Sequence, residues 1–68
     1  MNEYRIIHDM KMKGKSLVVL DRKREIDDMN KSKAIVGGSA YSFSLTHHEA
    51  SIIIDTLDEL NGKTIHFE

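Results

Sequence analysis

Four histidines are the residues best suited to metal binding or proton transfer: His8, His47, His48 and His66. Imidazole is the commonest metal ligand in proteins, and it gains or loses a proton near neutral pH. On a helix the strong metal pattern places two histidines four residues apart, but Ile52 occupies that position after His48. A composite metal site of His47, His48 and His66 with an acid is therefore a secondary hypothesis, and we expect no cofactor.

Nucleophilic catalysis has no recognisable set of residues in this chain. Cysteine is absent, which excludes thiol nucleophiles and thiolate zinc sites. None of the serines lies in the Gly-x-Ser-x-Gly turn that exposes a catalytic hydroxyl. The segment Gly14-Lys15-Ser16 matches the end of a phosphate-binding loop, but Asp9 stands where that loop needs its first glycine. The sequence therefore predicts no catalytic residue and a protein that is not an enzyme.

Two clusters of basic residues could bind phosphate groups, and both lie in the first half of the chain. The clusters are Lys11, Lys13 and Lys15, and Arg22, Lys23 and Arg24. Up to Ala34 there are nine Lys/Arg against six Asp/Glu, and from Ile35 onward one against five, which together give the net charge of -1. Binding surfaces for nucleic acid often interleave aromatic residues, and Tyr4 is the only one in the basic half. Nucleic-acid binding through these six residues is therefore the alternative function, and the uneven charge also suits self-association.

Alternating apolar residues predict a hairpin at the start of the chain. One face of the segment 4–12 holds Tyr4, Ile6, His8, Met10 and Met12. A turn at Gly14 leads into residues 16–20, which are apolar on both faces. Such two-sided apolarity predicts a strand that is central in a sheet or covered by a partner.

The middle of the chain predicts a second hairpin. Residues 34–36 and 40–46 have strand-forming composition and flank the pair Gly37-Gly38, which favours a tight turn. The charged segment 21–33 between the two hairpins is interpreted as a loop with one helical turn.

A helix is predicted from His47 to Asn61. Thr46 and Glu49 have the spacing of a capping box, and Gly62 is suited to end the helix. Apolar residues recur at helical spacing, at Ala50, Ile53, Ile54, Leu57 and Leu60. With a last strand at 63–68, the element order is β-β-β-β-α-β. The predicted fold class is α+β, a mostly antiparallel sheet of four to five strands with one helix packed on one face.

Length and composition predict one domain, residues 1–68, in the cytoplasm. A chain of 68 residues builds a thin core that supplies only about 3–5 kcal/mol of net stability. The first residues lack the basic stretch and apolar run of a secretory signal, and the absence of cysteine suits a reducing compartment. Small size without cysteine is also typical of bacterial and phage accessory proteins.

Apolar side chains beyond those that one helix can cover predict an interaction surface. Ile52 lies opposite the apolar stripe of the predicted helix, and a sheet with one helix leaves its second face uncovered. The residues assigned to this surface are Ile7, Val18, Leu20 and Ile52. We expect a non-enzymatic interaction module that docks through an apolar sheet face or an edge strand. The expected partner is a second copy of the chain, with another protein as a further partner and no role for a membrane.

Overall fold

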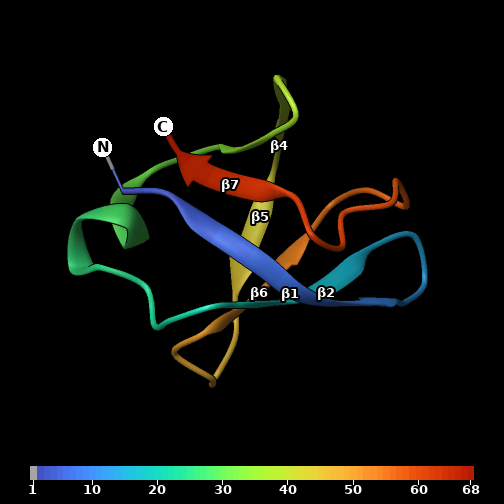
Figure 1. Ribbon diagram of the computed structural model, residues 1–68, viewed down its shortest axis with the longest axis horizontal. Helices are drawn as coiled ribbons and strands as arrows, with labels where there is room; N and C mark the ends of the chain where they lie inside the picture. The colour runs from blue at the N-terminus through green and yellow to red at the C-terminus, as the bar shows by residue number, and fades with distance from the viewer. Residues whose placement is uncertain (1) are drawn as a thin grey trace.

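Short antiparallel strands joined in one sheet form the fold, seen in a computed structural model that describes residues 2–68 (Figure 1). The seven strands of these residues are β1 (Tyr4–Lys11), β2 (Ser16–Leu20), β3 (Ala34–Val36), β4 (Ser39–Tyr41), β5 (Phe43–Leu45), β6 (Ser51–Ile54) and β7 (Thr64–Phe67). Their order in the sheet is β4-β3-β7-β1-β2-β6-β5. A 3-10 turn, η1 (Ile26–Asn30), connects β2 to β3.

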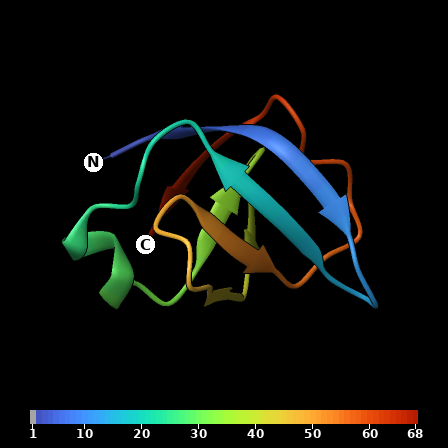
Figure 2. The same ribbon diagram turned by 90° about the horizontal axis from the view of Figure 1, so that it is seen from below.

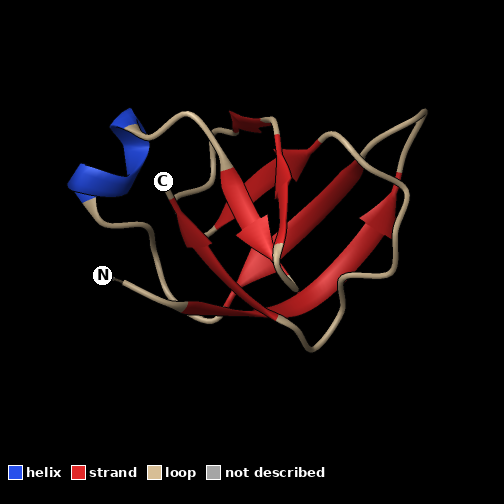
Figure 3. Ribbon diagram, turned by 90° about the horizontal axis from the view of Figure 1, so that it is seen from above, coloured by secondary structure: helices blue, strands red, loops and turns tan. Residues whose placement is uncertain are grey.

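The sheet bends over on itself because the strands at its two ends are consecutive in the chain. Only Ser42 separates β4 from β5, although β4 pairs with β3 and β5 pairs with β6. Figures 2 and 3 show the strands crossing one another around a common interior, with η1 at the side where both termini lie. This curvature gives every strand an inner face toward the core and an outer face toward solvent.

The interior is filled by apolar side chains from the sheet and from the loop before β7. The buried apolar residues are Tyr4, Ile6, Val18, Leu20, Ala34, Val36, Ile52, Ile54, Leu60, Ile65 and Phe67. The Phe67 ring packs edge-on to Tyr4, with 5.8 Å between ring centroids, and lies 4.9 Å from the Phe43 ring. Complete burial of one such large side chain contributes about 1.5–3 kcal/mol, so this small set supplies most of the stability.

The predicted α+β class is wrong, because the segment expected to be a helix contributes a strand and loops. Ile52, Ile53 and Ile54 form most of β6, which lies between β2 and β5. Three consecutive β-branched residues are stiff in a helix and pack well in a sheet. The two-sided apolar strand β2 also needs a strand neighbour, and β6 supplies it.

The residues that resemble helix caps have other roles in this fold. The Thr46 hydroxyl accepts from the amide of His48 at 3.1 Å instead of from the amide of Glu49. This short loop interaction is typical of a Thr turn. Gly62 has φ of +83° in the turn that leads into β7, a conformation that glycine adopts without steric cost. Both residues therefore favour tight turns as readily as helix ends.

The predicted hairpin of β1 and β2 is confirmed, but the second hairpin differs from the prediction: the run 40–46 is divided at Ser42 into β4, which pairs with β3, and β5, which pairs with β6. A bulge also changes which side chains of β1 face the core. β1 pairs with β2 across the Gly14 turn, and β3 pairs with β4 across Gly37-Gly38. The β1–β2 register shifts between Ile6 and His8. An extra residue in a strand inverts the faces of all residues after it.

The inversion overturns the predicted common face of β1. Tyr4 and Ile6 are buried, whereas His8, Met10 and Met12 are exposed. Asp9, which follows the bulge, turns its side chain inward instead.

The segment 21–33 is a loop containing η1, as predicted. Among residues 2–68, no helix has the length and apolar character needed to cross a membrane.

Candidate interaction surface

A continuous apolar area covers the outer side of β1, β2 and β6, and we call it the outer apolar face. It consists of Met10, Leu17, Val19, Ala50 and Ile53. Met10 pairs with Leu17 across β1 and β2, and Leu17 pairs with Ile53 across β2 and β6. Residues directly opposite each other in adjacent strands share one side of the sheet, so these three side chains form a row. Met10 is 51% exposed, and the other four are half-buried.

Two shallow hollows flank this row. One, of about 380 Å³, is lined by Leu17, Val19, His48, Ala50 and Ser51. The other, of about 390 Å³, is lined by Leu45, Thr46, His47 and Ile53. Both hollows therefore include the turn between β5 and β6, and each receives one histidine from it. Apolar walls with a few polar groups at the rim are typical of contact surfaces.

Hydrogen bonds from Arg24 and Thr46 hold the β5–β6 turn in place. The Arg24 amide donates to the Glu49 carbonyl at 2.9 Å, and its guanidinium donates to the His48 carbonyl at 2.9 Å and to the Ser51 carbonyl. The hydroxyls of Thr46 and Ser51 lie 2.6 Å apart. Because buried backbone carbonyls need donors, these contacts fix the wall of the first hollow.

Of the four residues predicted to form the interaction surface, the structure exposes only Ile7. Ile7 is 55% exposed at the bulge of β1, whereas Val18, Leu20 and Ile52 are buried in the core. The exposure predicted for Ile52 followed from the predicted helix, and both predictions are wrong. Residues 16–20 are apolar on both faces, and the prediction that Val18 and Leu20 lie on the outside is wrong. The outward residues of β2 are Leu17 and Val19.

The basic residues predicted for nucleic acid do not form one cationic surface. The Lys11 ammonium is 2.9 Å from the Asp9 carboxylate and 2.8 Å from the Ser16 hydroxyl. Arg24 is buried against the β5–β6 turn, as described above. The Arg22 guanidinium lies 4.3 Å from the centroid of the Tyr4 ring and donates to the Glu3 carbonyl at 2.6 Å. Lys13, Lys15 and Lys23 are exposed, and Lys15 approaches Asp55 to 3.9 Å.

A polar network closes the end of the sheet beside the β1–β2 turn. One Asp9 carboxylate oxygen accepts from Lys11 and from the Leu60 amide at 2.9 Å, while the other is buried and has no hydrogen-bond partner among the described residues. The Ser16 hydroxyl donates to the Thr56 carbonyl at 2.7 Å. Burial alone would raise the pKa of Asp9, but the hydrogen bonds from Lys11 and Leu60 outweigh it and lower that pKa.

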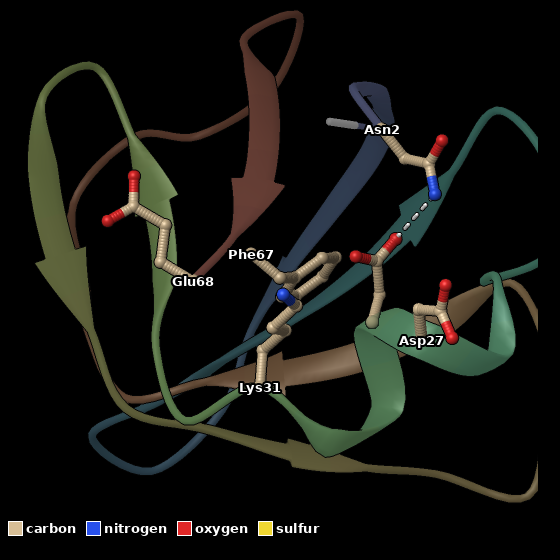
Figure 4. Close-up of a pocket in the computed structure, with 6 residues that line it drawn as sticks. Asn2, Asp27, Lys31, Phe67 and Glu68 are labelled. Carbon is tan, nitrogen blue, oxygen red and sulfur yellow. Dashed lines mark hydrogen bonds between the residues drawn. The ribbon is translucent and has the colours of Figure 1, made fainter.

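A further hollow lies near η1 and has a volume of about 620 Å³ (Figure 4). Its lining residues are Asn2, Asp27, Asp28, Lys31, Phe67 and Glu68. Asp28 accepts from the Tyr4 hydroxyl at 2.5 Å and from the Asn2 amide at 3.4 Å, the bond drawn in Figure 4. The Tyr4 oxygen in turn accepts from the Glu25 amide at 2.8 Å. Asp28 is therefore engaged in holding η1 and the 21–25 loop against the core.

Burial and the hydrogen bond to Asp28 raise the pKa of Tyr4. The phenol stays protonated at neutral pH, and it can therefore donate to Asp28 while accepting from the Glu25 amide. These contacts explain why a tyrosine is tolerated in the core.

The histidines predicted as a composite metal site are not brought together. His47 and His48 lie on the β5–β6 turn, while His66 lies on β7 with its ring nitrogen 2.9 Å from the Glu68 carboxylate. Across residues 2–68, no three His, Asp or Glu side chains are grouped to hold a metal ion. Comparisons of the chain with models of protein families, with curated proteins and with solved structures find no match.

Proposed function

We propose that this protein is a non-enzymatic interaction module that associates with a second copy of itself through the outer apolar face. The observation that supports this proposal is the row formed by Met10, Leu17 and Ile53 across three adjacent strands. Water on such a row is released when a second apolar surface covers it, which favours association. The absence of cysteine suits a module that works in the reducing environment of the cytoplasm.

The shape of the face supports a second copy as the occupant. Met10 projects on the β1 side, while the hollow at Val19 and Ala50 lies on the β2–β6 side. In a two-fold arrangement the projection of each copy meets the hollow of the other, because both copies present the same surface. Methionine is flexible and polarisable, so it adapts to such a hollow. The net charge of -1 produces little repulsion between copies.

The size of the face predicts weak association. Three strands about 4.8 Å apart and five residues of about 3.3 Å each give sides of roughly 14 Å and 17 Å. A stable dimer normally buries about 800 Å² on each partner, which is more than this area provides. We therefore expect a dimer that forms at high protein concentration and dissociates on dilution.

The sheet face supports docking better than the edge strands do. β4 and β5 at the ends of the sheet order have three residues each and are joined through Ser42. Such short edges offer few backbone groups to an added strand.

Molar mass in solution, measured by light scattering over a concentration series, tests the proposal. We expect the mean mass to rise with concentration for the native protein. Met10→Glu should stay monomeric because it places a charge within the contact, at a site already half in solvent. Leu57→Glu is the matched control, since Leu57 is 58% exposed in the loop between β6 and β7 and lines neither hollow.

A native protein that remains monomeric at millimolar concentration would contradict the proposal. Equal association by the native protein and Met10→Glu would show that another surface makes the contact.

A further inference from the structure

Histidines border the outer apolar face on two sides. His8 pairs with Val19 in the row next to Leu17, and His48 lines the hollow formed by Leu17, Val19 and Ala50. His47 lines the neighbouring hollow with Ile53. His66 lies elsewhere, on β7, where it contacts Glu68. We propose that protonation of His8 and His48 dissociates the two copies, so that association is controlled by pH between neutral and mildly acidic conditions; this inference rests on the proposed function.

On the β2 side His8 faces no charge, while on its other side β1 contacts the loop that carries Asp58 and Glu59. Val19 and Ser51 continue its row across β2 and β6, and neither carries a charge. The adjacent Asp9 turns inward and is engaged by Lys11 and the Leu60 amide. A proton gained by His8 therefore places a charge beside an apolar contact on the β2 side.

Arg24, Glu49 and the apolar wall of the hollow surround His48. The Arg24 guanidinium donates to the His48 carbonyl, so one cation is already present behind the turn. Glu49 follows His48 in the chain and is exposed beside Lys23 and Glu25 in a separate hollow. On the β2 side the hollow presents Leu17 and Val19, which cannot balance a charge.

Covering a charged imidazole with a partner costs more free energy than covering a neutral one, so protonation of His8 and His48 weakens the association. Neutral imidazole is largely apolar and can be covered by a partner, whereas imidazolium must keep its water or find an acceptor. Association is therefore strong where the two imidazoles are neutral and is lost where they are charged.

The experiment measures the dimer dissociation constant of the full chain by sedimentation velocity at about pH 7.5 and about pH 5.5. Both buffers contain 0.5 M NaCl, which suppresses general charge repulsion between copies. We expect the constant of the native protein to rise at least about tenfold at the lower pH, since each 1.4 kcal/mol is tenfold. In a His47→Gln background, which removes the third histidine beside the face, the variant His8→Gln/His48→Gln should keep one dissociation constant at both pH values. His66→Gln should behave as the native protein does.

The outcomes separate this inference from the proposed function. Association at pH 7.5 that is unchanged at pH 5.5 overturns the switch alone. A double variant that still dissociates at pH 5.5 also overturns it. A protein that is monomeric under both conditions overturns the switch and the proposed function together. Circular dichroism of each sample identifies loss of fold, and dissociation accompanied by unfolding counts against the switch.

Discussion

At the scale of single residues, two buried polar groups connect loops to the sheet. Asp9 turns inward beside the β1–β2 turn, and the Tyr4 hydroxyl lies among the buried atoms near η1. Each makes hydrogen bonds to a segment distant in the chain, Asp9 to Leu60 and Tyr4 to Asp28. A buried polar group that loses its partner costs about 1–3 kcal/mol, a large share of the stability of so small a chain.

Asp9→Asn should lower the free energy of unfolding by about 1–3 kcal/mol at neutral pH, because it removes the ionic bond to Lys11. The pKa of Asp9 is lowered in the folded state, so its stabilisation is present above the unfolded value of about 3.9 and is lost as pH falls through the folded value. The difference in the free energy of unfolding between the native protein and the variant should therefore become smaller below pH 4. Urea denaturation at several pH values measures this difference. A constant difference down to pH 2 would contradict the assigned network.

Tyr4→Phe should destabilise the protein by a similar amount, about 1–3 kcal/mol, because Asp28 and the Glu25 amide lose their partner. The pKa of Tyr4 is raised, so its contribution is fully present below the unfolded value of about 10 and is lost as pH rises through the higher folded value. Thermal denaturation between pH 7 and 11 should show the two proteins converging at the alkaline end. Tyr41→Phe is the control, since that hydroxyl bonds to Asp58 at an exposed site.

At the scale of elements, β6 is the segment whose conformation organises the candidate surface. It places Ile52 and Ile54 in the core and Ile53 on the outer apolar face. A strand alternates its faces at every residue, whereas a helix would group Ile53 with Ile54. The contrast between neighbouring isoleucines therefore reports directly on the element type.

Ile52→Ala should cost about 2–5 kcal/mol and leave the protein largely unfolded, because its side chain is completely buried. Ile53→Ala should cost about 1 kcal/mol or less, because half-buried surface positions tolerate truncation. Chemical denaturation measures the free energy of unfolding of each variant. If Ile53→Ala were the more damaging substitution, β6 would not have the orientation described.

At the scale of the whole molecule, the last strand joins parts of the chain that are far apart in sequence. β7 pairs with β1 on one side and with β3 on the other, and it buries Ile65 and Phe67. The sheet is therefore incomplete until the final residues are in place. Folding that depends on such distant pairings is slow for the size of the chain, in the range of milliseconds to seconds.

Deletion of residues 64–68 should abolish the folded state, because it removes the pairing partner of both β1 and β3. Loss of chemical-shift dispersion in an amide correlation spectrum would show this. The full-length variant Thr64→Ala, which changes an exposed side chain of β7, should keep a native spectrum. A truncated chain with a native-like spectrum would mean that the remaining strands form the sheet without β7.

The sequence by itself determined the local elements with distinct signals. Glycines at positions 14 and 37–38 fix the two hairpin turns, and the two-sided apolar segment 16–20 identified a strand with neighbours on both sides. It also predicted an apolar surface for a partner at Ile7, Val18, Leu20 and Ile52, of which the structure exposes only Ile7. Because segment 16–20 is apolar at every position after Ser16, its pattern does not show whether the even or the odd residues face the core.

Tertiary structure alone decided the segment 47–61 and the orientation of β1. The apolar residues of that segment fit a helix by spacing and a strand by composition, and Thr46 and Gly62 suit turns as well as caps. Pairing with β2 and β5 makes residues 51–54 a strand. The backbone hydrogen bonds of this strand and the burial of its isoleucines require those two neighbouring strands. The bulge between Ile6 and His8 likewise has no mark in the sequence, since it appears only in the pairing of β1 with β2.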